Sequence, residues 1–163
     1  MENENKACSD TGPILHLNEI NKISLLKIFS KIIISFYIKE ELLKYKIDFL
    51  PKNIEIHNVN KDQVLLIAEK YDLNIGESSV IWLNKNLKIP ILLTDDLDAR
   101  EVAISLDIKA VGTVGIIMRS FRENIIDENS AIQILKDIHE KSSLFVTKEL
   151  INYAINQIRK FKK

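Results

Sequence analysis

The chain has 163 residues, of which 46% are hydrophobic and 28% charged, a composition typical of globular rather than disordered proteins. Its 23 basic and 23 acidic residues cancel, so overall charge does not indicate a nucleic-acid partner and any electropositive surface must be local. No apolar run approaches the roughly 20 residues that span a bilayer, no secretory signal is recognisable, and a single cysteine excludes an internal disulfide. We therefore expect one cytoplasmic domain over residues 1–163, with no membrane association and its core at about residues 6–150.

The first candidate strand ends at an acidic residue. Residues 6–10 are polar for a strand, and they lead into the motif Ser9-Asp10-Thr11-Gly12-Pro13. The glycine permits a tight turn and the proline suits the start of a helix, whose apolar face begins at Ile14. Asp10 then lies between a strand and a helix. It is either an ordinary helix N-cap, which is the more common role, or a metal ligand at the edge of a sheet.

A second acid follows the next strand. Residues 32–36 are rich in β-branched side chains and predict a strand that runs into a helix. This helix carries Glu40 and Glu41 near its start, where the helix dipole alone favours acids. Successive helical residues point about 100° apart, so at most one of the two faces a shared site. Glu41 shares a side with Ile38 and Leu42, which favours it over Glu40.

The middle of the chain supplies a third acid. Residues 51–59 alternate as a peripheral strand and residues 62–71 form an amphipathic helix. Gly76 then precedes a helix that holds Glu77 in its first turn and Trp82, interpreted as packing, further on. The histidines have no ligand-like companions and there is one cysteine, so a zinc site is not indicated. They are therefore assigned to structure or surface: His16, His57 and His139.

The clearest pattern is a strand–helix–strand unit late in the chain. Residues 89–93 form a short apolar run that stops at Thr94-Asp95-Asp96, and a helical segment at 99–106 and a short strand at 108–111 follow. In open parallel sheets, ligands bind at the carboxyl ends of the strands. Two adjacent acids repel each other unless a cation, a proton or solvent relieves them. We therefore expect this tip to be the floor of a metal site, joined by the acids described above.

The rest of the chain is helical. Gly112-Thr113-Val114-Gly115 begins a helix at 116–121, in which Thr113 is more typical of a cap than of a catalytic residue. Residues 129–140 and 147–162 form amphipathic helices. The basic end, residues 159–163, is interpreted as a solvated helix end, with contact to RNA phosphate as the alternative. Alternating strands and helices predict an α/β fold with a mainly parallel sheet.

Together these motifs resemble those of the PIN-domain nucleases, which include the toxin ribonucleases of many bacterial and archaeal toxin–antitoxin modules. The resemblance covers roughly residues 6–150 and is closest to a branch with Gly-Glu, Asp-Asp followed by arginine, and Gly-Thr-Xaa-Gly. Here these motifs are Gly76-Glu77, Asp95-Asp96 with Arg100, and Gly112 to Gly115. The chain departs from the family in its polar first strand and in its third acid, Glu77, where many members carry aspartate.

The resemblance implies a three-layer α/β/α fold and a divalent-metal-dependent endoribonuclease, the toxin of a type II toxin–antitoxin module. It also implies an RNA substrate, a cognate antitoxin and a homodimer. Mg²⁺ or Mn²⁺ suits an all-carboxylate site, since both prefer oxygen ligands. The implied catalytic and metal-binding residues are Asp10, Glu41, Glu77 and Asp96, with Asp95 as a further metal ligand that is able to replace Asp96. The implied substrate-binding or orienting residues are Ser9, Thr11, Thr94 and Arg100.

Two further alternatives stay open at this stage, and a third is discounted. Arg100 either binds a phosphate oxygen or pairs with Asp96, four residues earlier on the same helix. The chain as a whole is either a nuclease or a non-catalytic PIN-like module that binds nucleic acid or protein. A receiver-type signalling domain is discounted, because it places its acid pair after the first strand and its phosphorylated aspartate after a middle strand, the reverse of the order here.

Overall fold

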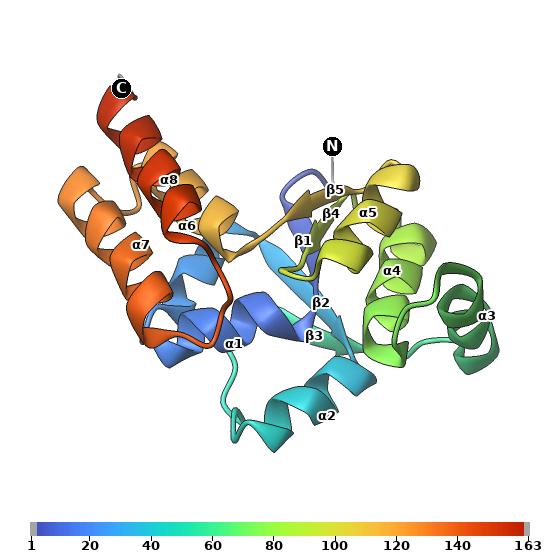
Figure 1. Ribbon diagram of the computed structural model, residues 1–163. Coiled ribbons are helices and arrows are strands. Elements are labelled where there is room, and N and C mark those ends of the chain that lie inside the picture. Colours follow the sequence, from blue (N-terminus) through green and yellow to red (C-terminus); the bar gives the residue numbers. More distant parts are fainter. Residues whose placement is uncertain (1–2, 162–163) are drawn as a thin grey trace.

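Five strands form one parallel sheet in the computed structural model, which describes residues 3–161. The sheet order is β3-β2-β1-β4-β5, and every neighbouring pair is parallel. The central strand is therefore the first in the chain, and the second and fourth strands flank it (Figure 1). The strands are β1 (Lys6–Ser9), β2 (Lys31–Ser35), β3 (Ile54–His57), β4 (Ile91–Leu93) and β5 (Lys109–Val111).

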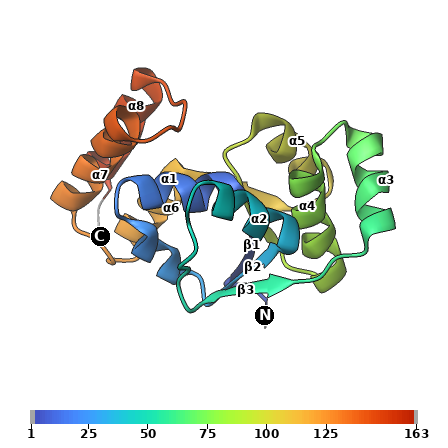
Figure 2. The same cartoon turned by 90° about the horizontal axis from the view of Figure 1, so that it is seen from below.

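Helices cover both faces of this sheet. The helices are α1 (Thr11–Glu19), α2 (Phe36–Lys44), α3 (Lys61–Tyr71), α4 (Ile75–Leu87), α5 (Leu97–Ser105), α6 (Thr113–Arg122), α7 (Glu128–Lys141) and α8 (Lys148–Lys160), and a 3-10 helix, η1 (Ile23–Ile28), follows α1. Seen from below, α3, α4 and α5 lie to one side of the sheet, and α1, α6, α7 and α8 lie to the other (Figure 2). This is the three-layer α/β/α fold that the sequence predicts.

The polar first strand forms because of where it lies. Residues Lys6–Ser9 have weak strand propensity, but β1 pairs with a strand on each side. Ala7, Cys8 and Ser9 are fully buried between the helical layers. Strand propensity depends strongly on packing context, and a central position outweighs it here. Burial in apolar surroundings raises the pKa of the Cys8 thiol, so this cysteine is a core residue.

The peripheral elements also agree with the sequence pattern. The third strand, β3, lies at the edge of the sheet, and Trp82 of α4 packs partly buried against the core. No helix within residues 3–161 is long and apolar enough to cross a membrane. Of the basic segment at residues 159–163, Arg159 and Lys160 belong to the last turn of α8, and Lys162 and Lys163 lie outside the described residues.

The strand order places two polar loops side by side. From β1 the chain winds outward to β2 and β3, then returns to the other side of β1 as β4. In open parallel sheets such a reversal leaves a crevice at the carboxyl ends of the two strands, where ligands bind. The strands β1 and β4 end at Ser9 and Leu93, and the amide of Asp10 donates to the Leu93 carbonyl at 2.8 Å. Asp10 and the segment Thr94–Asp96 therefore meet at this crevice.

Candidate functional site

An open cavity of ≈ 790 Å³ lies at the carboxyl edge of the sheet. Its walls come from the ends of β1 and β4, from α1 and α2, from the start of α4 and from the loop between α7 and α8. All five acids singled out from the sequence line it, although they are spread over 87 positions of the chain (10 to 96). They are Asp10, Glu41, Glu77, Asp95 and Asp96.

Asp10 combines both roles considered for it. Its Oδ1 accepts a hydrogen bond from the Thr11 amide at 2.9 Å, which caps α1. Its Oδ2 accepts from the Thr94 hydroxyl at 3.1 Å, which ties the end of β1 to the end of β4. Ser9 lies beneath the cavity, fully buried, with its hydroxyl donated to the Asp10 carbonyl. The orienting contact predicted for Thr94 is thus made to Asp10, while Ser9 does not line the cavity.

Glu41 reaches the cavity from the second turn of α2. The helix dipole favours acids only in the first turn, and α2 begins at Phe36, five residues before Glu41. The dipole therefore does not explain an acid at Glu41, although the sequence suggested that it would. The Thr11 hydroxyl donates to its Oε2. Glu40 is exposed and lies outside the cavity lining, so the preference for Glu41 by helical facing is consistent with the geometry.

Glu77 and Asp96 are both capping residues whose carboxylates approach each other. Glu77 forms a capping box with Asn74 at the start of α4. Asp96 is the N-cap of α5 and accepts from the Ala99 amide at 2.8 Å. After burial, repulsion from the Asp96 carboxylate is the largest contribution to the raised pKa of Glu77. The two helix starts therefore bring their acids to one place.

Burial and repulsion between carboxylates raise the pKa of two acids of the cavity, Asp10 and Glu77. Burial raises the pKa of Asp10 to about 6, and the charges of Glu41 and Asp96 add to that shift against the hydrogen bonds from Thr11 and Thr94. Burial raises the pKa of Glu77 to about 7, followed by repulsion from Asp96 and Asp10. Carboxylates that repel each other in this way form a site whose negative charge a bound cation would offset.

The raised pKa values predict how the stability of the metal-free protein depends on pH. A carboxyl group with a higher pKa in the folded state stabilises the fold fully below its unfolded pKa, and this contribution is lost as the pH rises through the folded pKa. In the presence of a chelator, we therefore expect the free energy of unfolding to fall from about pH 4 to about pH 7, relative to an Asp10→Asn/Glu77→Gln double variant. Urea unfolding at several pH values measures this difference. Parallel pH profiles for the two proteins would contradict it.

Asp95 is turned into a separate hydrogen-bond network. Its Oδ1 accepts from the Thr113 amide at 2.7 Å, and its Oδ2 accepts from the Thr113 hydroxyl at 2.6 Å and lies 2.7 Å from Nδ1 of His16. Only 11% of the Asp95 side chain and 12% of the His16 side chain are exposed. Asp95 thus joins β4, α1 and the start of α6. The predicted cap, Thr113, is the first residue of α6, and its N-cap is Gly112.

Arg100 does not take the intrahelical partner that its spacing allows. Within residues 3–161 no ion pair joins it to Asp96, whose Oδ1 caps α5 instead. A Cβ atom at Gly112 would lie 2.9 Å from a guanidinium nitrogen of Arg100 and 2.8 Å from Oδ1 of Asp95. The guanidinium group therefore lies beside Gly112, and Arg100 is not among the residues that line the acidic cavity. Of the two roles considered for Arg100, the geometry leaves open the contact with a phosphate.

The oxygen donors of the cavity fit a hard divalent cation, although the acids are too far apart to coordinate one ion as they stand. In the part of the chain that is described, no three histidine, cysteine or acidic side chains are close enough together to hold a metal ion. The cavity nevertheless offers carboxylate and hydroxyl oxygens without any thiol, and its histidine is engaged with Asp95. Such oxygen donors match Mg²⁺ and Mn²⁺ better than softer metals. Asp10, Glu41, Glu77 and Asp96 are the side chains that would hold the ion.

Gly76 makes room for Glu41. It lies inside α4, and a Cβ atom there would come within 2.7 Å of Oε1 of Glu41. We expect Gly76→Ala to displace the Glu41 carboxylate and to lower metal affinity about tenfold or more, while the free energy of unfolding is kept or raised, since alanine favours helix. Calorimetric titration with Mn²⁺ and urea unfolding measure the two effects. Gly115→Ala, in a helix away from Glu41, is the matched control, and equal metal affinity in both variants would contradict this role.

The sequence did not point to every residue that lines the cavity. His16 was assigned to structure or surface, and its pairing with Asp95 depends on the fold rather than on local spacing. Lys44 and Tyr45 at the end of α2 line the cavity because they lie one helical turn after Glu41, on the same side of the helix. The segment Ser143–Phe145 carries no motif, and only the placement of α7 and α8 brings it to the cavity.

Comparison with known proteins agrees with the geometry. A family model described as a PIN domain matches residues 6–160, nearly the whole chain. Searches of curated proteins and of solved structures gave no match.

Proposed function

Because the chain belongs to the PIN-domain family, a family of nuclease-type fold, we propose that it is a divalent-metal-dependent endoribonuclease that hydrolyses RNA phosphodiester bonds in the acidic cavity. One observation carries this proposal. The buried carboxylate of Asp10 lies at the strand reversal, and its pKa is raised to about 6 by burial and by the neighbouring charges of Glu41 and Asp96. A catalytic cation site requires such a cluster of acids in an open crevice.

The roles of the side chains follow from their contacts. Asp10, Glu41, Glu77 and Asp96 would hold Mg²⁺ or Mn²⁺, which supplies positive charge at the scissile phosphate and acidifies water there. The Thr94 hydroxyl donates to one oxygen of Asp10, and the same hydroxyl accepts from the Asp96 amide at 3.1 Å. Thr11 fixes Glu41 in the same way. Both hydroxyl groups would thus orient acids, and Arg100 would contact a phosphate.

The biological setting belongs to the same proposal. We infer a toxin of a type II toxin–antitoxin module that acts in the cytoplasm as a homodimer. A cognate antitoxin would inhibit it by covering the acidic cavity. The cavity is wide open, as access by a polynucleotide or by an inhibiting partner requires.

A non-catalytic PIN-like module is the second candidate, and one observation favours it. The acids are engaged with local partners: Asp96 and Glu77 cap helices, and Glu41 accepts from Thr11. No three of them converge within residues 3–161. A module that binds nucleic acid or protein would keep these contacts unchanged when the metal is added.

Metal removal separates the two candidates. We expect a mixed RNA pool to be cut by the protein with Mn²⁺ or Mg²⁺, to survive with a chelator, and to be cut again when the ion is restored, because the acids alone repel an approaching phosphate. Denaturing gel electrophoresis measures the fragments, and a DNA pool run beside it tests the choice of RNA. An intact RNA pool under every metal condition would favour the non-catalytic module.

A further inference from the structure

A second cavity adjoins the acidic one. It has a volume of ≈ 510 Å³ and lies between the start of α5, the strand β5, α6 and the loop that joins α7 to α8. Asp95, Leu144 and Phe145 line both cavities. A chain molecule bound in the acidic cavity would therefore continue into the second one.

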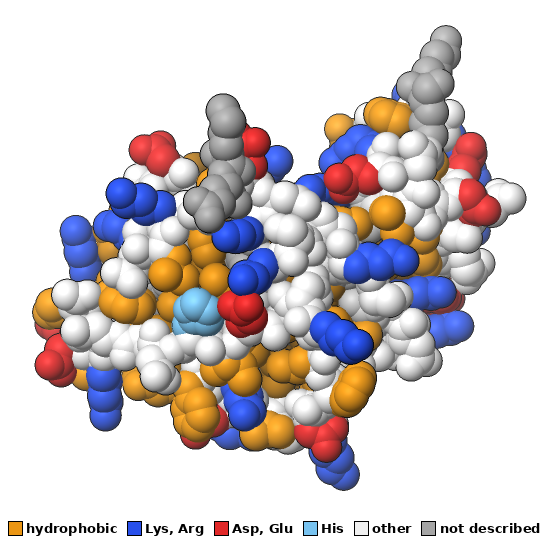
Figure 3. All heavy atoms as spheres, turned by 180° about the vertical axis from the view of Figure 1, so that it is seen from behind, with side chains coloured by type: hydrophobic (Ala, Val, Ile, Leu, Met, Phe, Trp, Pro, Cys, Tyr) orange, Lys and Arg blue, Asp and Glu red, His pale blue; other side chains and the backbone are white. Residues whose placement is uncertain are grey.

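The two cavities carry opposite charge. Four cations line the second cavity, namely Arg100, Lys109, Arg119 and Arg122, and Asp95 is the one acid among its lining residues. Arg119 is occupied by Glu123 and by the ring of Phe29, 4.7 Å away. Within residues 3–161, no carboxylate forms an ion pair with the other three. The chain has no net charge, and on the back face basic side chains are spread among acidic and apolar ones (Figure 3), so this cluster is local.

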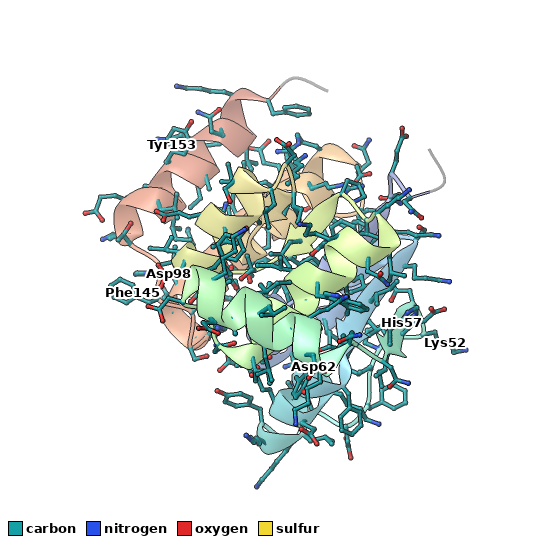
Figure 4. All side chains as sticks on the ribbon, turned by 90° about the vertical axis from the view of Figure 1, so that its right-hand side faces the viewer. Lys52, His57, Asp62, Asp98, Phe145 and Tyr153 are labelled. Carbon is teal, nitrogen blue, oxygen red and sulfur yellow. The ribbon has the colours of Figure 1, made fainter. Side chains whose placement is uncertain are left out.

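An exposed aromatic ring lies where the cavities meet. Phe145 is 94% exposed and projects from the loop between α7 and α8 (Figure 4). The loop itself is held in place, because the amide and hydroxyl groups of Ser143 donate to Glu19 and the Val146 carbonyl contacts His139 at 3.1 Å. Leu144 and Val146 on either side pack against the core. The loop thus presents a ring to solvent from a fixed position.

We propose that this second cavity binds the RNA strand beside the scissile phosphate, with Arg100, Lys109 and Arg122 contacting phosphates and Phe145 stacking on an unpaired base. The inference rests on the proposed nuclease function, since it names how the substrate strand continues from the acidic cavity. It specifies a single strand at this point, because a base in a duplex offers no free face to the ring.

The combination of cations and an exposed ring favours a nucleic-acid single strand over an apolar partner. Single strands are held by basic grooves that follow the backbone and by aromatic side chains on which bases stack. A purely apolar partner would leave three unpaired cations buried, at a large desolvation cost. The adjacent acids also repel phosphate unless a cation is bound, so the basic cavity supplies the attraction that the active site lacks.

Binding without cleavage tests this inference separately from the nuclease function. We would measure the fluorescence anisotropy of a labelled single-stranded RNA of mixed sequence, with a chelator present, over a range of salt concentrations. Phe145→Ala is expected to weaken binding about five- to a hundredfold with an unchanged salt slope. Arg122→Gln is expected to weaken binding and to reduce the magnitude of the salt slope by about 0.7. Phe145→Trp should restore binding.

Matched controls and outcomes make the test decisive. Phe49→Ala removes another exposed phenylalanine, 88% accessible. Lys61→Gln removes an exposed cation at the start of α3, and neither residue lines these two cavities. Both controls should bind as the parent does. If Phe145→Ala and Arg122→Gln also bind as the parent does, the inference is overturned even if the parent cuts RNA. If the two variants lose binding while the parent never cuts RNA, the strand site stands and the nuclease function falls.

Discussion

Asp10→Asn is expected to reduce metal-dependent RNA cleavage at least about a hundredfold, because substitutions one shell further from a metal already cost up to about that factor. The substitution keeps the shape of the side chain. The asparagine oxygen still accepts from the Thr11 amide, and its NH₂ group donates to the Thr94 hydroxyl, which is able to accept as well as donate. Initial rates on one RNA substrate, with Mn²⁺ saturating for each protein, measure the effect.

The same variant should not be less stable. At neutral pH the parent carries a buried carboxylate whose charge is disfavoured, as its pKa of about 6 shows. A neutral amide avoids that cost, so the free energy of unfolding in chelator should be equal to that of the parent or higher. Asp62→Asn, on the exposed start of α3, is the matched control and should leave both quantities unchanged (Figure 4). Full cleavage by Asp10→Asn would refute the assigned site.

The sequence predicted the fold and the convergence of distant acids for a simple geometric reason. Parallel strands present their carboxyl ends at one edge, so an acid within a few residues of a strand end, such as Asp10 or Asp96, arrives there irrespective of its separation in the chain. Helical facing was enough to favour Glu41 over Glu40. These inferences need only local periodicity and the parallel connection of strands.

The sequence could not assign partners that depend on tertiary packing. Asp95 and Asp96 are adjacent and chemically alike, yet one turns towards Thr113 and His16 and the other caps α5. The difference depends on how α1 and α6 dock, and no local pattern records that docking. Phe145 was missed for a related reason. An exposed aromatic residue in a loop has no periodicity, and its position beside two cavities follows from the packing of α7 and α8.

The divergence of the two adjacent acids leads to the second large expected effect. Asp95→Ala removes the acceptor for the Thr113 amide, the Thr113 hydroxyl and the His16 ring, all of which are largely buried. Leaving such groups without a partner costs about 1–3 kcal/mol each when they cannot reach water, so we expect the free energy of unfolding to fall by about 2–4 kcal/mol. Asp96→Ala should cost only about 1 kcal/mol, the value of a lost N-cap, while it removes a proposed ligand. Urea unfolding in chelator compares the two.

A double-mutant cycle assigns the stabilising contribution of Asp95 to its network. Thr113→Val removes one donor, and in combination with Asp95→Ala it should show a coupling of about 1 kcal/mol or more, because the two residues are in direct contact. Asp98 is an exposed acid in the first turn of α5. Asp98→Ala is the control and should leave the free energy of unfolding nearly unchanged. The opposite pattern is a stable Asp95→Ala protein that no longer binds Mn²⁺. It would make Asp95 a metal ligand, with its carboxylate turned from Thr113 towards Asp10 when the ion is bound.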